Sequence, residues 1–259
     1  MALWLHSLSN YQIGFIVIFS FLSVSVIIPA LIRYKLDLDP RESIAAGADE
    51  SYKMFITLVL VMIGFSLVQL QGDHKNVEDL VSREATLNLK ISSLLHRFDT
   101  KESSQAKELL ANYVESIAKE EWPELSKGNG SDVTAKKLKD VTKAISNLSP
   151  NSNEQDTVKA DLDATMTQVV DIRDARLATT RLYLQTYLWG SLACFLVVMI
   201  FFGWFINPLS RMIFFVGGVS LGISMLISLI FILEDLYQGE SALIPKPLLD
   251  ILPLILKGN

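Results

Sequence analysis

Long apolar runs alternate with polar segments along the chain, and four of these runs contain no charged residue. They cover residues 11–32, 55–70, 187–206 and 212–233. A helix needs about 20 predominantly apolar residues to cross the hydrocarbon core of a bilayer. The run at 55–70 is the shortest, so we expect its helix to begin near Tyr52, with the Lys53 side chain reaching to the headgroups. The pattern therefore predicts four transmembrane helices.

The first apolar run is not typical of a cleaved signal peptide. The leader MALWLHSLSN contains no Lys or Arg, and the run exceeds the roughly 7 to 15 residues of a signal-peptide core. We therefore expect the first helix to remain in the protein.

The segment between the second and third runs, residues 71–186, is polar, and its apolar residues recur at helical spacing. Each stripe predicts a helix with one apolar face. We expect the first of these helices to continue from the second transmembrane helix. The fourth should begin near Glu154 and continue unbroken into the third transmembrane helix, with two inserted helices between. The stripes are Leu80, Leu87, Ile91, Leu94 and Phe98; Leu109, Tyr113 and Ile117; Leu138, Val141, Ile145 and Leu148; and Val158, Leu162, Met166 and Val169.

Two helix ends within this segment follow from its breakers. Pro123 disfavours helical geometry at the residue before it, so the helix from about Ser103 is predicted to end near Trp122. The turn SKGNGSD follows, and we expect Asp132 or Thr134 to cap the next helix.

These patterns predict an all-α integral membrane protein with a helical extramembrane domain inserted between the second and third transmembrane helices. Four mostly apolar helices leave little room for an aqueous path within one chain, so we expect a homo-oligomer in the lipid bilayer. The predicted organisation is residues 1–70 for transmembrane helices 1 and 2 with a short loop, 71–186 for the domain, 187–235 for transmembrane helices 3 and 4, and 236–259 for a C-terminal tail.

The charge distribution bears on partners and on sidedness. Acidic and basic side chains are interspersed in the domain, whereas nucleic-acid binding requires a basic stripe, so we expect no nucleic-acid partner. Basic residues in short loops favour the cytoplasmic side, and Arg33, Lys35, Arg41 and Arg211 lie in loops opposite the domain. This predicts a bacterial inner-membrane protein with the domain outside the cytoplasm. Six basic residues near the domain's two membrane joins oppose that orientation: Lys75, Arg83, Lys90, Arg173, Arg176 and Arg181.

Residues that could support catalysis are few. The histidines are His6, His74 and His96, and if the last two share one helix they lie roughly 33 Å apart. The chain has no HExxH motif, phosphate-binding loop or CxxC pair, and its single cysteine, Cys194, lies inside the third apolar run. We expect no enzymatic activity, no cofactor and no metal site.

One carboxylate falls on an apolar stripe. Glu84 lies four residues after Leu80 and three before Leu87, so its head should be partly withdrawn from water, where a charge requires a partner. The returning helix supplies basic residues at a similar height, and we predict an ion pair between Glu84 and Arg176. The alternative is that Glu84 lies at the edge of the stripe and stays solvated.

The Trp-Pro pair at 122–123 also has two interpretations. Trp122 is a large apolar side chain at the point where its helix should meet its neighbours, which predicts a structural brace. The alternative is a ring on which a ligand stacks.

The last apolar run carries Ser220, Ser224 and Ser228 at four-residue spacing, with Gly218 and Gly222 forming a GxxxG pair. Small residues let transmembrane helices pack closely and form hydrogen bonds with each other, so we favour packing over pore lining for this stripe. Serines on one face could alternatively line a pore. Asp235 follows Glu234 at the end of this run, either as part of an acidic ring in an oligomer or as a solvated helix end.

Several short blocks resemble, in order, the signature of the bestrophin-like family of bacterial membrane proteins of unknown function. They are GFSLVQL leading into SREATLNL, then NYVESIAKEEWPEL, RDARLATTRLYLQTYLW and LEDLYQGESALIPKPLLDIL. In the last block, Leu236-Tyr237-Gln238 replaces a more usual run of Arg or His, Pro and Phe. The family pattern falls on Glu84 and Ala85; on Tyr113, Glu121, Trp122 and Pro123; on Arg173, Arg176 and Leu177; and on Asp235 and Gly239.

This resemblance covers the chain from about Gly47 onward, and it implies similarity to bestrophins, which are oligomeric anion channels with helical extramembrane domains. The bestrophin selectivity neck and calcium clasp are not found in this sequence. The leading hypothesis is an oligomeric ion channel, anion-conducting by resemblance, with a permeating ion as its ligand. The alternative is a non-conducting membrane sensor or scaffold that binds a partner through its helical domain.

Overall fold

The computed structural model describes residues 9–36, 40–181, 186–234, 236–237, 240 and 242–257. All regular elements in these ranges are helical. The chain forms two compact units, each built from two separate stretches of sequence. Residues 1–72 and 183–241 form the membrane unit, and residues 73–182 and 242–259 form the helical unit.

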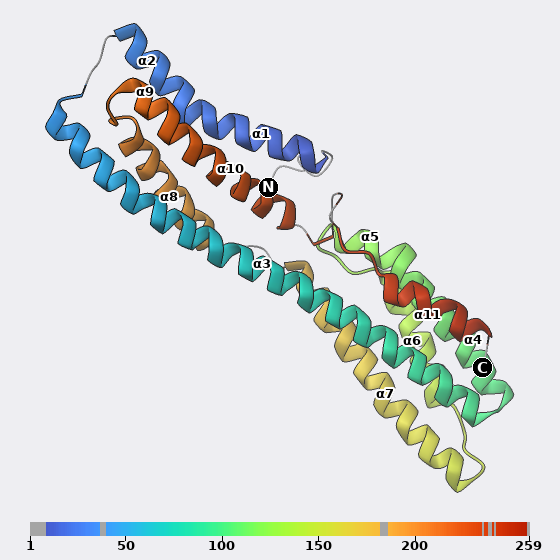
Figure 1. Ribbon diagram of the computed structural model, residues 1–259. Helices are drawn as coiled ribbons and strands as arrows, with labels where there is room; N and C mark the ends of the chain where they lie inside the picture. The colour runs from blue at the N-terminus through green and yellow to red at the C-terminus, as the bar shows by residue number, and fades with distance from the viewer. Residues whose placement is uncertain are drawn as a thin grey trace. The chain divides into compact units, whose positions relative to one another are not determined.

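The membrane unit is built from apolar helices. They are α1 (Asn10–Leu22), the π turn η2 (Ser23–Ile27), α2 (Ile28–Leu36), the first part of α3 (Glu42–Phe98), α8 (Thr186–Gly203), α9 (Leu209–Arg211), the π turn η5 (Met212–Val216) and α10 (Gly217–Leu233). In this unit α1 packs along α10 (Figure 1). The centre is apolar and includes Tyr52, Val59, Ile63, Leu192, Met199, Ile223, Ile227 and Ile230.

Among the described residues, three helical stretches are long and apolar enough to cross a membrane: Asn10–Leu36, Glu42–Phe98 and Leu209–Leu233. The stretch Tyr187–Gly203 is apolar but shorter. The structure thus provides three candidate membrane spans, and the fourth stays a prediction.

The helical unit contains the second part of α3, α4 (Lys101–Ser116), the π turn η3 (Ile117–Glu121), α5 (Trp122–Leu125), α6 (Asp132–Ser146), α7 (Asn153–Ala178), η4 (Thr179–Arg181) and α11 (Lys246–Lys257). The predicted stripes of α6 and α7 are buried. On α3 the buried face is shifted, because Leu80 and Leu87 are only half-buried while Val77, Val81 and Ile91 are buried. The C-terminal helix α11 packs on α4 through Leu248, Ile251 and Ile255.

The predicted helix end at Trp122 is wrong. Helical structure continues past Pro123 to Leu125, and the preceding turn, Ile117–Glu121, is a π turn in which the Trp122 amide donates to the Ile117 carbonyl. A proline ring clashes with the carbonyl four residues earlier in a regular α-helix, and a wider turn relieves that clash. The same arrangement precedes Pro29, where η2 covers Ser23–Ile27.

Two further boundaries differ from the predictions. Ser131, rather than Asp132 or Thr134, caps α6, and its side chain accepts from the Thr134 amide. The fourth helix starts at Asn153, one residue from the predicted start, but its α-helical part ends at Ala178 and a 3₁₀ turn follows. This turn interrupts the predicted α-helix within the described residues, and residues 182–185 of the predicted join lie outside them. By contrast α3 runs continuously over Glu42–Phe98, which confirms the continuous helix predicted at that join.

A buried charge network as the candidate functional site

Five side chains in the core of the helical unit form one hydrogen-bonded charge network. Arg176 donates to Glu84 from Nε to Oε2 at 2.7 Å and from Nη2 to Oε1 at 3.2 Å. The same Nη2 donates to Glu121 Oε1 at 2.7 Å. Arg173 donates from Nε to Glu121 Oε2 at 3.1 Å and from Nη2 to the same oxygen. The Tyr113 hydroxyl donates to Glu84 Oε1 at 3.1 Å.

Three segments far apart in sequence bring these groups together. Glu84 lies on the buried face of α3, seven residues before Ile91. Arg173 and Arg176 are three residues apart in α7 and therefore share one face of that helix. Glu121 is the last residue of the π turn η3. Because that turn is wider than an α-helical one, it changes the direction of Glu121 relative to the α4 residues before it.

Burial makes these charges dependent on one another. Glu84, Glu121 and Arg176 are 0% exposed and Arg173 is 8% exposed. Two carboxylates balance two guanidinium groups, so the network carries no net charge. Removing one partner of a buried pair leaves an uncompensated charge and costs about 3–5 kcal/mol. We interpret the network as a device that selects which faces of α3, η3 and α7 meet, rather than as a large net source of stability.

The surroundings shift two pKa values in directions that support this arrangement. Burial opposes the charge of Arg176, but the adjacent carboxylates of Glu84 and Glu121 outweigh it and raise the pKa of the guanidinium. Burial, together with the negative charge of Glu84, raises the pKa of the Tyr113 phenol well above its ordinary value. Arg176 therefore stays charged and Tyr113 stays a neutral donor at physiological pH.

Two buried polar atoms beside the network have no hydrogen-bond partner within the described part of the chain. They are Arg176 Nη1 and Asn88 Oδ1. Asn88 is anchored by its other side-chain atom, since Nδ2 donates to the Glu84 carbonyl at 2.8 Å. A buried water bridges such groups in many proteins.

The predicted ion pair between Glu84 and Arg176 is confirmed, with both side chains buried. The helical spacing of the sequence did not predict the second half of the network, the pairs that Glu121 forms with both arginines. The signal was nevertheless in the sequence, because the resemblance blocks placed Tyr113, Glu121 and Arg173 in the same family pattern.

Trp122 lies between the network and the C-terminal segment. Its ring centroid is 5.9 Å from the Arg176 guanidinium carbon, within the range of a cation–π contact. Its Nε1 donates to the Leu243 carbonyl at 2.8 Å. The side chain is half-buried. These contacts favour the brace over the ligand-stacking alternative. They also show that Trp122 contacts the segment before α11.

The serine stripe of α10 points into the membrane unit. Ser220 and Ser224 are fully buried and Ser228 is 7% exposed. The Ser224 hydroxyl donates to the Leu221 carbonyl at 2.8 Å, and the Ser228 hydroxyl donates to the Met225 carbonyl at 2.7 Å. Ser228 Oγ lies 4.0 Å from the position that a Cβ on Gly14 of α1 would occupy. This geometry favours packing over pore lining.

The GxxxG pair lies on the opposite side of the same helix. Gly218 and Gly222 are exposed, and nothing lies within 4 Å of a Cβ placed on either. At the end of α10, Glu234 accepts a hydrogen bond from Trp189 Nε1 at 2.8 Å. The predicted site residues Asp235 and Gly239 lie outside the described residues.

A second buried arginine clamps one end of the membrane unit. Arg33 of α2 is 8% exposed and donates from Nη1 to the carbonyls of Ile206 at 2.8 Å and Trp204 at 3.4 Å. It also donates to the side chain of Asn207, whose Nδ2 donates to the Pro40 carbonyl at 2.8 Å. The guanidinium thus ties the end of α2 to the loop after α8 and, through Asn207, to the segment before α3.

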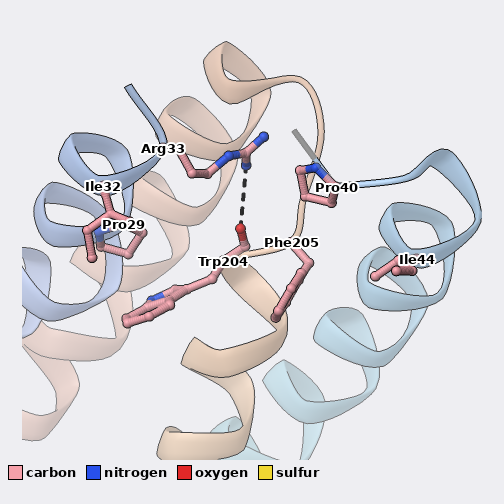
Figure 2. A pocket seen from close by; sticks show the side chains of 7 residues that line it. All are labelled: Pro29, Ile32, Arg33, Pro40, Ile44, Trp204 and Phe205. Atoms are coloured by element: carbon pink, nitrogen blue, oxygen red, sulfur yellow. Dashed lines mark hydrogen bonds between the residues drawn. The ribbon is translucent and has the colours of Figure 1, made fainter. Parts of the chain in front are cut away.

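A cavity of about 340 Å³ lies beside this clamp. Figure 2 shows Arg33 above the backbone of Trp204, with Pro40 and Ile44 on the other side of the view from Pro29 and Ile32. The other lining residues, Pro29, Ile32 and Phe205, are apolar. Within the described ranges, no three His, Cys, Asp or Glu side chains come together as metal ligands.

A family model described as the Bestrophin-like domain matches residues 53–248, more than half of the chain. The matched stretch contains all five network residues and Trp122. No curated protein and no solved structure matches the chain.

Proposed function

Because the chain belongs to the Bestrophin-like family, we propose that it is the subunit of an oligomeric ion channel that conducts anions. The observation that carries this proposal is the family match over residues 53–248, together with helices long and apolar enough to cross a membrane. We place Thr186–Gly203 as a fourth crossing and the protein in a bacterial inner membrane, with the helical unit outside the cytoplasm.

The interior of one membrane unit supports a path formed by several subunits. Several of its buried hydroxyls are bonded to carbonyls of their own helices, as in Ser25 to Phe21 and Ser66 to Met62, whereas those of Tyr52 and Ser220 have no such carbonyl partner among the described residues. The side chains around them are apolar. Because hydroxyls bonded in this way do not form a chain of polar groups across the unit, water and ions would pass between subunits.

The outer face of α10 supports such an assembly. Gly218 and Gly222 are spaced as a GxxxG pair and are exposed on the single chain. This motif allows the backbones of two transmembrane helices to approach closely. A second copy of the chain is therefore the proposed partner of this face.

The direct test is ion flux through purified protein in liposomes under a potassium chloride gradient. We expect a protein-dependent current whose reversal potential lies towards that of chloride. The Gly222→Leu variant should lose both the oligomer and the current, while Gly64→Leu, at another open glycine within an apolar helix, serves as the matched control. A folded, oligomeric protein that carries no current would contradict the channel.

One observation favours the alternative of a non-conducting scaffold. Leu249 and Leu256 of α11 lie seven residues apart, and so on one face of the helix, and both are large apolar side chains exposed on the helical unit. Exposed apolar patches mark interaction sites. The flux measurement separates the two candidates, since a scaffold would bind a partner through this face and carry no current. Neither candidate involves catalysis, a cofactor or nucleic acid.

A further inference from the structure

A groove on the helical unit gathers basic side chains away from the buried network. It has a volume of about 540 Å³ and lies along α3, with contributions from α4 and α11. Its polar lining residues include Lys90, Ser93, His96 and Arg97 of α3 and Lys107 of α4. We call it the basic groove.

The periodicity of α3 explains how these groups come to share one face. Thr86, Lys90, Ser93 and Arg97 recur at intervals of four, three and four residues, which is the spacing of one helical face. Lys90 and Arg97 are therefore two turns apart, roughly 10.5 Å along the axis. Ser93 lies between the two cations in this row, whereas the Thr86 hydroxyl donates to the Ser82 carbonyl within α3. Lys107 faces this row from α4.

The groove contains cations without anions. None of its lining residues is Asp or Glu. Arg97 approaches Glu154 at 3.7 Å, but both side chains are more than half exposed, so water screens this pair. Like charges confined to one depression repel each other, and such a depression concentrates counter-ions of the opposite sign.

A neighbouring groove on the same unit is lined by both acidic and basic side chains. It is similar in size, about 550 Å³, and lies between α3 and α7. Its lining contains Asp79 and Asp171 as well as Arg83. The two grooves share Thr86, so the contrast in charge arises across a single helix.

We infer that the basic groove binds a multiply charged, phosphate-bearing anion. Phosphate oxygens accept several charge-assisted hydrogen bonds at once from arginine, lysine and hydroxyl donors. The row on α3 offers such donors over a distance that suits two or more linked phosphate groups. Leu89 and Leu254 also line the groove and would contact an apolar part of the same ligand. This site goes beyond the proposed conduction and does not depend on it.

The test uses the full chain in phosphatidylcholine nanodiscs, with inorganic tripolyphosphate as the probe and calorimetry as the readout. We expect saturable binding that weakens as salt rises. The double variant Lys90→Ala/Lys107→Ala should weaken binding at least tenfold, and Lys90→Arg/Lys107→Arg should restore most of it. Lys136→Ala/Lys139→Ala, on α6, is the control with the same loss of charge and should bind as the wild type does.

Two further arms identify the source of the phosphate and the competing occupant. If nanodiscs that contain cardiolipin, whose headgroup links two phosphate groups, abolish tripolyphosphate binding to the wild type, the groove takes its phosphates from a lipid headgroup. If binding is equal in both nanodiscs, the ligand is a soluble phosphate. Equal affinity of the wild type and the Lys90/Lys107 double alanine variant overturns the proposal. Dissociation of the oligomer in that variant, seen by native mass spectrometry without any probe binding to the wild type, also overturns it and assigns the groove to a second copy of the chain.

The binding arms contain no flux measurement. A chain that binds tripolyphosphate but carries no current would therefore support this site and contradict the channel. A chain that carries a current but does not bind tripolyphosphate would support the channel and contradict this site.

Discussion

The buried serines of the membrane unit and the buried carboxylates of the helical unit have partners at different distances along the chain. In the membrane unit, hydroxyls such as those of Ser66 and Ser224 bond to carbonyls three or four residues earlier in their own helix. In the helical unit, Glu84 and Glu121 bond to residues more than 50 positions away. A local bond leaves the neighbouring helix free to slide or rotate, whereas a bond between helices constrains both. Where α1 packs on α10, register is therefore set by shape, and Arg33 adds contacts between segments only at the end of α2. In the core of the helical unit, charge sets the register.

Both units contain a proline that follows a π turn. Pro29 and Pro123 each follow a π turn by two residues. In the helical unit the π turn also places Glu121 in the network. In the membrane unit it precedes the helix that ends near Arg33, whose guanidinium holds the loop after α8.

The largest loss of stability is expected for Arg176→Ala. It leaves Glu84 fully buried without a cation, and we expect a loss of about 3–5 kcal/mol in the free energy of unfolding. Urea unfolding of the protein in detergent, followed by circular dichroism, measures this loss. Arg83→Ala removes an exposed arginine from α3 and should change the free energy by less than about 0.5 kcal/mol. A loss as small as that of the control would contradict the network.

Glu84→Gln keeps the shape of the side chain and removes its charge. Arg176 still reaches Glu121, so we expect a smaller loss of about 2 kcal/mol and a melting temperature lower by several degrees. Differential scanning fluorimetry measures the shift, with Glu78→Gln at an exposed α3 position as the control. An unchanged melting temperature would mean that Glu84 is solvated.

Trp122→Phe tests the brace to the C-terminal segment. The variant retains a ring beside Arg176 but removes the hydrogen bond to the Leu243 carbonyl, which we expect to cost about 1 kcal/mol. Hydrogen exchange should accelerate in residues 242–257 and remain unchanged in α6. Uniform acceleration across the helical unit would show a general loss of stability and would not support a local brace.

Tyr113→Phe removes the phenol that donates to Glu84, with an expected cost near 1 kcal/mol at neutral pH. Its pKa is raised in the folded state, so its contribution is complete below the unfolded value of about 10 and is lost as the pH rises above it. The wild type should therefore lose more stability than the variant between about pH 9 and 11. Parallel pH profiles would contradict this assignment.

The smallest effect is expected on the other side of the comparison. Ser224→Ala removes a hydroxyl bonded within its own helix, and we expect a change within about 0.5 kcal/mol and no change in oligomeric state. Thermal unfolding and native mass spectrometry provide the two readouts. Loss of ion flux in a variant of unchanged stability would instead indicate that Ser224 lines the pore.

The sequence alone predicts the apolar runs and the helical stripes of residues 138–148 and 158–169, and it offers the pairing of Glu84 with Arg176 as one of two interpretations. These depend on composition and periodicity, which act over a few turns of helix, and on the rule that a buried charge needs a partner. The predicted stop at Trp122 failed because proline preferences describe α-helical turns, and here a π turn precedes the ring.

Which helix faces meet depends on the tertiary structure. Ser224 and Gly222 lie on one helix with similar sequence surroundings, yet one is buried and the other is exposed, because α1 covers only one side of α10. The position of Glu121, the second carboxylate of the network, depends in the same way on the direction of η3. The basic groove depends on α4, which brings Lys107 to the same groove as Lys90 and Arg97. Such juxtapositions join residues that no periodic pattern relates, since they depend on how separate helices pack.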